Sequence, residues 1–87
     1  MPNKNYVRGR RKEYAIVKKL KEMGYSIAQR SAGSHSPIDV FAINPQTRVI
    51  KFIQAKPDSL SENKKKEIEH ANSWLNNVFR CEFEVLL

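Results

Sequence analysis

The chain has 87 residues, of which 40% are hydrophobic, and one cysteine, Cys81. A chain of this length forms one small domain (residues 1–87) that buries only about 60 to 65% of its unfolded surface, so association with a second copy would help to stabilise it. The single cysteine excludes an intrachain disulfide, and we expect it to be a small buried residue. There is no transmembrane run and no signal-peptide core, so we expect an intracellular, cytoplasmic protein without membrane contact.

The net charge of +7 is concentrated near the N-terminus. The first 30 residues carry nine Lys or Arg against two Glu, whereas residues 31–87 carry seven basic and seven acidic side chains. Clustered basic side chains bind polyanions because the phosphates release their condensed counterions. Nucleic acid is therefore the expected partner, and the alternative is a solvated basic helix without a ligand.

The first half of the chain predicts a helix and then a strand. Residues 1–8 have no apolar periodicity, and we expect a mobile basic arm there. Apolar residues at steps of three and four predict a helix from residue 9 or 10 to residue 23: Tyr14, Val17 and Leu20, joined by Ile16 and Met23. Gly24 should end this helix in the left-handed conformation. A strand over 25–30 and a loop of small and polar residues over 31–37 follow.

The second half predicts two more strands, a helix and a final strand. The two strands cover about 38–44 and 48–56, with a turn at Asn44-Pro45-Gln46-Thr47. Ser59 and Glu62 have the spacing of a capping box, and an apolar stripe predicts a helix over about 60–78. Residues 81–87 alternate like a half-buried strand. The order α-β-β-β-α-β predicts an α/β fold with a mixed four-stranded sheet flanked by helices.

The most informative side chains lie at the ends of two predicted strands. Asp39 opens one strand, while Gln54 and Lys56 lie two positions apart at the end of the next, so their side chains share a face. If the two strands pair as a hairpin, Asp39 reaches that face too. A carboxylate, an amide oxygen and an ammonium group would then converge. Such a set suits a divalent cation that prefers oxygen ligands, such as Mg²⁺, and can offset charge on a phosphate.

These segments resemble the PD-(D/E)XK nuclease superfamily, and within it the archaeal Holliday junction resolvases. The matching segments run in order over about residues 8–57: Gly9-Arg10-Arg11-Lys12-Glu13 with Ile16-Val17-Lys18-Lys19-Leu20, Met23-Gly24-Tyr25, Arg30-Ser31-Ala32-Gly33-Ser34, Asp39-Val40 and Gln54-Ala55-Lys56. The resemblance implies a restriction-endonuclease-like core and a Mg²⁺-dependent endodeoxyribonuclease, in which Mn²⁺ substitutes for Mg²⁺. The substrate it implies is branched DNA, such as a four-way junction in DNA recombination and repair. We expect a homodimer, because the chain is small and a two-fold symmetric junction needs two symmetric cuts.

The resemblance also implies a role for each matching residue. Asp39 would be the central metal ligand, and Glu13 would bind the metal directly or through water. The Gln54 side chain and the backbone carbonyl of Ala55 would complete the metal shell. Lys56 would act on the attacking water or on the phosphate charge, so that the catalytic set is Glu13, Asp39, Gln54 and Lys56. The expected DNA-binding residues are Arg8, Arg10, Arg11, Arg30, Ser31 and Ser34.

Two residues depart from the family pattern. Gln54 stands where the family usually has Glu, and a neutral amide is a weaker Mg²⁺ ligand than a carboxylate. We interpret Gln54 as a tolerated ligand. Tyr14 stands where an arginine usually follows the helix glutamate, and Arg10 or Arg11 would supply that charge.

Other interpretations of the same residues remain open. The chain can be a DNA-binding module that keeps the nuclease fold with weak or no catalysis, or a subunit whose partner supplies specificity. Asp39 can be a turn cap after Pro37, Glu13 a solvated residue paired with Arg10, and Lys56 an ordinary strand-end lysine. His35 can be a general base, or it can touch a phosphate or lie in a mobile loop. On the second helix, Trp74 belongs either to the core or, together with Leu60, Phe79 and residues 81–87, to a dimer surface.

Overall fold

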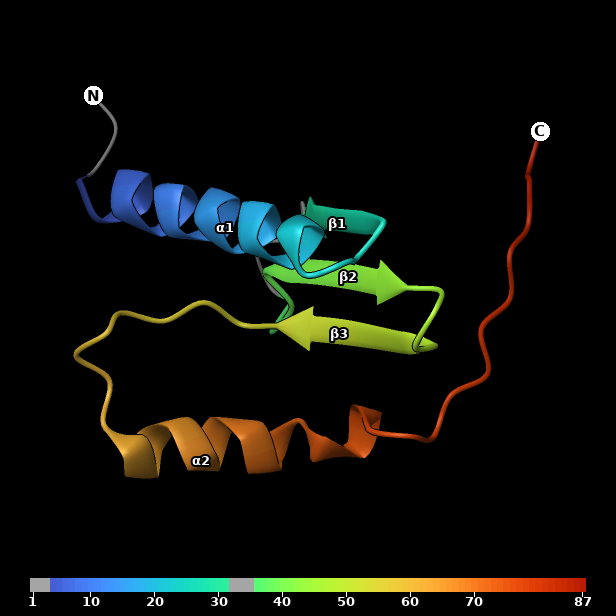
Figure 1. The fold of residues 1–87 in the computed structure, drawn as a ribbon. Coiled ribbons are helices and arrows are strands. Elements are labelled where there is room, and N and C mark those ends of the chain that lie inside the picture. Colours follow the sequence, from blue (N-terminus) through green and yellow to red (C-terminus); the bar gives the residue numbers. More distant parts are fainter. Residues whose placement is uncertain (1–3, 32–35) are drawn as a thin grey trace. The chain divides into compact units, whose positions relative to one another are not determined.

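The computed structural model describes residues 4–31 and 36–87, and side chains from residue 9 onward within these ranges. The chain divides into two compact units, Met1–Pro57 and Asp58–Leu87, where the sequence predicted one domain. The first unit holds α1 (Lys4–Glu22), β1 (Ile27–Arg30), β2 (Val40–Asn44) and β3 (Val49–Ile53) (Figure 1). The second holds α2 (Glu62–Ala71) and a 3-10 helix, η1 (Ser73–Leu75). The small α/β fold that the sequence predicted is therefore present, with a three-stranded sheet.

Helix α1 starts earlier than predicted and ends where predicted. Residues 4–8 are helical rather than part of a mobile arm, although only Lys4 and Arg8 among them are strong helix formers. At the other end, Gly24 has φ +102°. The backbone N–H groups of Gly24 and Tyr25 donate to the carbonyls of Lys21 and Leu20 (both 3.1 Å), which is the Schellman pattern. The predicted left-handed glycine cap is confirmed.

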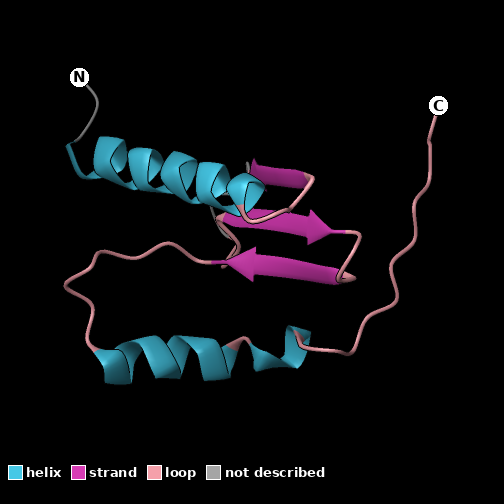
Figure 2. Cartoon of the chain, viewed as in Figure 1, coloured by secondary structure: helices cyan, strands magenta, loops and turns pink. Residues whose placement is uncertain are grey.

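The three strands form one antiparallel sheet in the order β1-β2-β3 (Figure 2). In β2, Val40, Ala42 and Asn44 are buried while the residues between them are half-buried, as expected for a central strand whose faces alternate. Helix α1 packs against β1 and β2. The core of this unit is small: Leu20, Tyr25, Ala28, Val40 and Ala42, with Ile16, Val17 and Ile53 packed against it.

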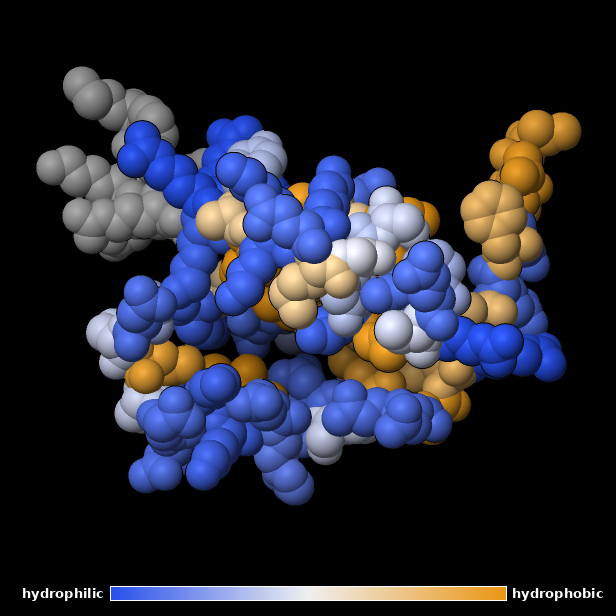
Figure 3. Space-filling view, in the orientation of Figure 1, coloured by the Kyte–Doolittle hydropathy of each residue, from blue (hydrophilic) through white to orange (hydrophobic). Residues whose placement is uncertain are grey.

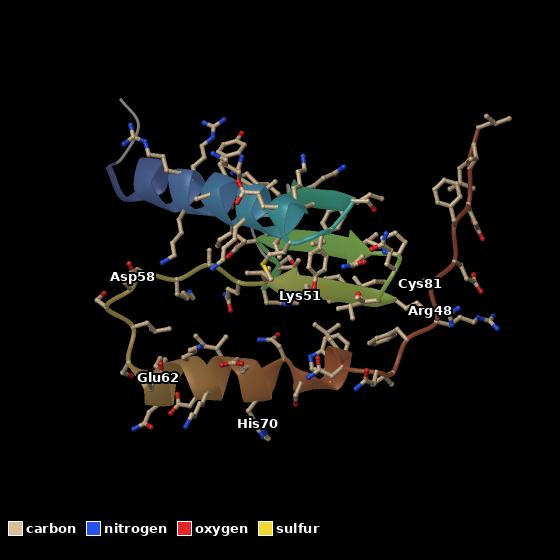
Figure 4. All side chains as sticks on the ribbon, viewed as in Figure 1. Arg48, Lys51, Asp58, Glu62, His70 and Cys81 are labelled. Atoms are coloured by element: carbon tan, nitrogen blue, oxygen red, sulfur yellow. The ribbon has the colours of Figure 1, made fainter. Side chains whose placement is uncertain are left out.

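The turn between β2 and β3 forms at the predicted residues. The Asn44 side-chain oxygen accepts hydrogen bonds from the backbone N–H groups of Gln46 (3.0 Å) and Thr47 (3.2 Å). This asparagine closes the turn with its own side chain and is buried without an unsatisfied group. Arg48 follows with φ +60°, and Figure 4 shows it at this end of the hairpin.

The second unit has less regular structure than the sequence predicted. Helix α2 is capped by Ser61, whose hydroxyl accepts from the Lys64 N–H (3.2 Å), rather than by Ser59. It ends at Ala71 because polar side chains bond to its last carbonyls: the Asn72 amide to Ile68 (2.9 Å) and the Ser73 hydroxyl to His70 (2.7 Å). Such side chains compete with helix continuation. No residue of α2 is buried.

The predicted fourth strand over 81–87 is not formed, and the sheet is antiparallel rather than mixed. A segment of alternating residues forms a strand only where another strand can pair with it. The unit Asp58–Leu87 contains no strand. The apolar side chains of this segment are exposed (Figure 3): Phe83, Val85, Leu86 and Leu87. Cys81 is exposed as well, so its predicted burial is wrong.

Neither helix in residues 4–31 and 36–87 combines the length and the apolar character that crossing a bilayer requires.

Candidate functional site

Three chain segments of the first unit meet at one end of the sheet. Arg30, Val40 and Ile53 lie side by side across the three strands, because Val40 pairs with both of the others. In an antiparallel sheet, the end of β1, the start of β2 and the end of β3 therefore share an edge. The residues predicted to form the site flank these strand ends. Ser31 follows β1, Asp39 precedes β2, and Gln54, Ala55 and Lys56 follow β3.

Asp39 is held at this edge by three hydrogen bonds to backbone groups of other segments, each 2.8 Å long. Its N–H donates to the carbonyl of Ile53, and its own carbonyl accepts from the N–H of Ser31. Its carboxylate Oδ2 accepts from the N–H of Ala55. Asp39 therefore joins both neighbouring chain segments, and its side chain reaches the segment after β3.

The hydrogen bonds do not support the alternative role of Asp39 as a local turn cap. The turn at Pro37 is capped by Ser36, whose hydroxyl accepts from the Ile38 N–H (3.1 Å). The Asp39 carboxylate instead bonds across 16 residues of sequence. A carboxylate has about four acceptor sites, so one hydrogen bond leaves capacity for a cation.

Gln54 and Lys56 flank Ala55, the residue that the Asp39 carboxylate contacts. Gln54 is half-buried and Lys56 is exposed. Strand β3 ends at Ile53, so both residues lie after the strand and not within it. The alternation of side chains along a strand therefore does not place Gln54 and Lys56 on one face. They lie near Asp39 because the Asp39 carboxylate accepts a hydrogen bond from Ala55 between them.

Glu13 of α1 reaches the same end of the sheet through Arg30. Its Oε1 lies 3.4 Å from Arg30 Nε, and the two side chains are only 18% and 25% exposed. The alternative pairing of Glu13 with Arg10 is therefore replaced by an ion pair that joins α1 to the end of β1. Because Ser31 follows Arg30 directly and bonds to Asp39, this pair lies next to the strand end that carries Asp39.

Tyr14 completes this cluster, and the sequence analysis assigned it to the apolar stripe. Its side chain is 53% exposed. Arg30 Nη1 donates to the Tyr14 hydroxyl (3.3 Å), and the guanidinium carbon lies 4.8 Å from the ring centroid. The sequence signal for this role is the spacing of Arg10 and Tyr14, because residues four apart on a helix are neighbours on its surface.

The electrostatics of the cluster favour negative charge at the Tyr14 hydroxyl. Hydrogen bonding from Arg30 and then from Arg10, together with their charges, lowers the pKa of Tyr14 below its ordinary value. The hydrogen bond to Tyr14 in turn raises the pKa of Arg30, with a smaller contribution from Glu13. Both guanidinium groups therefore act on one phenol oxygen.

The structure describes four of the six predicted DNA-binding side chains. Arg10 and Arg11 are exposed on α1, Arg30 is held by Glu13 and Tyr14, and Ser31 bonds to Asp39 through its backbone. The side chain of Arg8 and the whole of Ser34 and His35 lie outside the described residues.

The metal ligands predicted from the sequence are all oxygen atoms. The part of the chain that the structure describes holds no group of three or more His, Cys, Asp or Glu side chains placed to bind a metal. The predicted ligand set draws instead on amide and backbone oxygens, at Gln54 and Ala55, besides its carboxylates. Mg²⁺ accepts such oxygens and keeps several waters.

Comparison with protein-family models, with curated proteins and with solved structures gave no match to the chain.

Proposed function

We propose that the chain is a divalent-metal-dependent DNA endonuclease that cleaves branched DNA, with four-way junctions as its preferred substrate. The observation that carries this proposal is the 2.8 Å hydrogen bond from the Ala55 N–H to the Asp39 carboxylate. It links the aspartate before β2 to the Gln-Ala-Lys segment after β3, the two motifs that make the chain resemble the PD-(D/E)XK nucleases.

Each residue has a defined task in this proposal. Asp39, the Gln54 amide oxygen and the Ala55 carbonyl hold Mg²⁺ or Mn²⁺. The bound ion lowers the pKa of water and offsets charge on the phosphate. Lys56, exposed beside Ala55, stabilises the negative charge that develops as water attacks phosphorus. The products are a 3′-hydroxyl and a 5′-phosphate.

Glu13 changes partner in this account. In the free protein it is paired with Arg30, and a DNA phosphate that binds Arg30 releases the Glu13 carboxylate toward the metal. Exposed Arg10 and Arg11 bind neighbouring phosphates, as the excess of basic residues near the N-terminus favours.

A DNA-binding module without cleavage is the second candidate function. Two observations favour it. First, Gln54 is neutral. Second, the Glu13 carboxylate forms an ion pair with Arg30. Of the predicted metal ligands, Asp39 therefore supplies the one carboxylate that is not part of an ion pair. Such a protein would bind junction DNA with the same salt dependence and leave it intact.

The finer fold and the assembly belong to the same proposal. We infer that residues 81–87 add a fourth strand when a sheet edge is available, and that the active form is a homodimer. Trp74 and Phe79 contact each other edge to face, with centroids 5.8 Å apart, and both are 61% exposed. Exposed aromatic side chains and an unpaired alternating segment are typical of association surfaces.

The substrate preference can be tested with two DNAs of identical arm sequence, one a four-way junction and one a linear duplex. We expect Mg²⁺-dependent cuts in the junction at positions related by its two-fold symmetry, and little cutting of the duplex. Equal cutting of both DNAs would refute the junction preference and leave a general nuclease.

A further inference from the structure

Arg30, Tyr14 and Arg10 form a compact cationic cluster beside Glu13. Arg30 is fixed by three contacts: the 3.4 Å ion pair with Glu13, the 3.3 Å hydrogen bond to the Tyr14 hydroxyl and the stacking of its guanidinium 4.8 Å from the Tyr14 ring. A planar guanidinium held on an aromatic ring keeps its remaining donors aimed in one direction. The ring therefore orients Arg30 without using up its donors.

Arg10 adds a second guanidinium to the same place. It lies four residues before Tyr14 on α1, and residues with this spacing are neighbours on a helix surface. It is exposed, and its hydrogen bonding and charge contribute to the lowered pKa of Tyr14. Arg30 donates to the Tyr14 hydroxyl and Arg10 lies one helical turn away from Tyr14, with the Glu13 carboxylate as the acidic member of the cluster.

This composition is suited to a phosphate. Two like-charged guanidinium groups repel each other, and one carboxylate neutralises only one of them, so an anion between them is stabilising. A phosphate oxygen can accept from the free donors of both arginines and from the Tyr14 hydroxyl. The same positive charges that lower the pKa of Tyr14 attract a phosphate.

We propose that Arg10, Tyr14 and Arg30 form a phosphate-binding site in which Tyr14 is a positioning residue: its ring holds Arg30 and its hydroxyl donates to the phosphate. This inference rests on the proposed function, since the ligand is a phosphate of the DNA backbone. The site lies beside the strand end that carries Asp39, because Ser31, next to Arg30, bonds to Asp39. It would hold the DNA strand next to the metal site.

A purely structural role for Tyr14 makes a different prediction. If the contacts only attach α1 to β1, the loss of the Tyr14 hydroxyl lowers the melting temperature and leaves DNA affinity unchanged. If the hydroxyl contacts phosphate, its loss weakens DNA binding in a protein that remains folded at the assay temperature. Tyr14→Phe keeps the ring and the stacking with Arg30, so it separates the two roles.

The test measures binding of a fluorescent four-way junction by anisotropy in EDTA, across a salt series, so that cleavage cannot interfere. Tyr14→Phe should weaken binding about threefold to tenfold, the effect of one hydrogen bond, with an unchanged salt slope. Arg30→Gln should weaken binding and reduce the log-log salt slope by about 0.9. Arg48→Gln, at the other end of the sheet, removes the same charge and should bind like the wild type. Millimolar inorganic phosphate should compete only weakly, because it lacks the neighbouring phosphates of DNA.

Two results would overturn the proposal: wild-type affinity in Tyr14→Phe, or a weakening in Arg48→Gln equal to that in Arg30→Gln. Cleavage of the same junction by the wild type in Mg²⁺ is recorded separately. Loss of cleavage with the expected binding pattern would refute the nuclease proposal alone. Cleavage with no effect of the variants on binding would refute the phosphate site alone.

Discussion

The hydrogen bond between the Asp39 carboxylate and the Ala55 N–H gives Asp39 a structural role that can be separated from catalysis. Asp39→Ala removes the acceptor, whereas Asp39→Asn keeps one side-chain oxygen at the same reach and replaces the charged carboxylate by a neutral amide. A hydrogen bond to a charged group contributes about 1.5 to 3 kcal/mol, and because Asp39 and Ala55 are half-buried, so that water can replace part of the interaction, the lower value of about 1.5 kcal/mol applies.

In a chain of this size, about 1 kcal/mol shifts the melting temperature by roughly 4 to 8 °C. We therefore expect Asp39→Ala to melt about 6 to 12 °C below the wild type and Asp39→Asn to melt about 2 to 4 °C below it, since a neutral acceptor loses about 0.5 kcal/mol. Thermal unfolding followed by circular dichroism measures both, with the exposed Glu84→Ala as a control near the wild type. An alanine variant as stable as the wild type would refute the structural role of this bond, as would an asparagine variant as unstable as the alanine one.

Three further predictions concern the metal, the DNA and the assembly. Gln54→Glu should lower the Mg²⁺ concentration that gives half-maximal cleavage, because a charged oxygen replaces a neutral one; a higher requirement would show that Gln54 is not a ligand. Replacing Arg8, Arg10 and Arg11 by Ala should weaken DNA binding and reduce the salt slope by about 0.9 for each lost phosphate contact, whereas equal affinity at every salt concentration would count against a basic face on α1. Sedimentation at micromolar concentration should give a dimer, and a monomer that makes single uncoupled nicks would refute the resolvase-like assembly.

The sequence predicted the structure correctly where local chemistry determines it. Gly24 ends α1 in the left-handed conformation and Asn44 closes the hairpin turn, as predicted from residue type alone. The sequence failed where structure depends on a partner. Residues 81–87 alternate like a strand but have no strand of their own unit to pair with. The apolar stripe predicted a helix over about 60–78, and α2 ends at Ala71.

The candidate site was predictable in part, for a related reason. Pairing of the two strands was enough to bring Asp39 toward the segment around Ala55. The partner of Glu13 was not predictable, because Arg30 lies 17 residues away and only the packing of α1 on β1 brings them together. Tyr14 was assigned to the apolar stripe since its ring fits that periodicity, whereas its hydroxyl and its neighbouring arginines hold it at the surface.

The most direct test of the proposed activity is cleavage of a four-way junction by the wild type and by Asp39→Asn, in Mg²⁺, in Mn²⁺ and in EDTA. We expect the wild type to cut with either metal and not in EDTA, leaving 5′-phosphate ends, and Asp39→Asn to bind the junction without cutting it. An uncut junction that wild-type protein binds in both metals would contradict the nuclease and favour the DNA-binding module. Cutting by Asp39→Asn at the wild-type rate would contradict the assignment of the site.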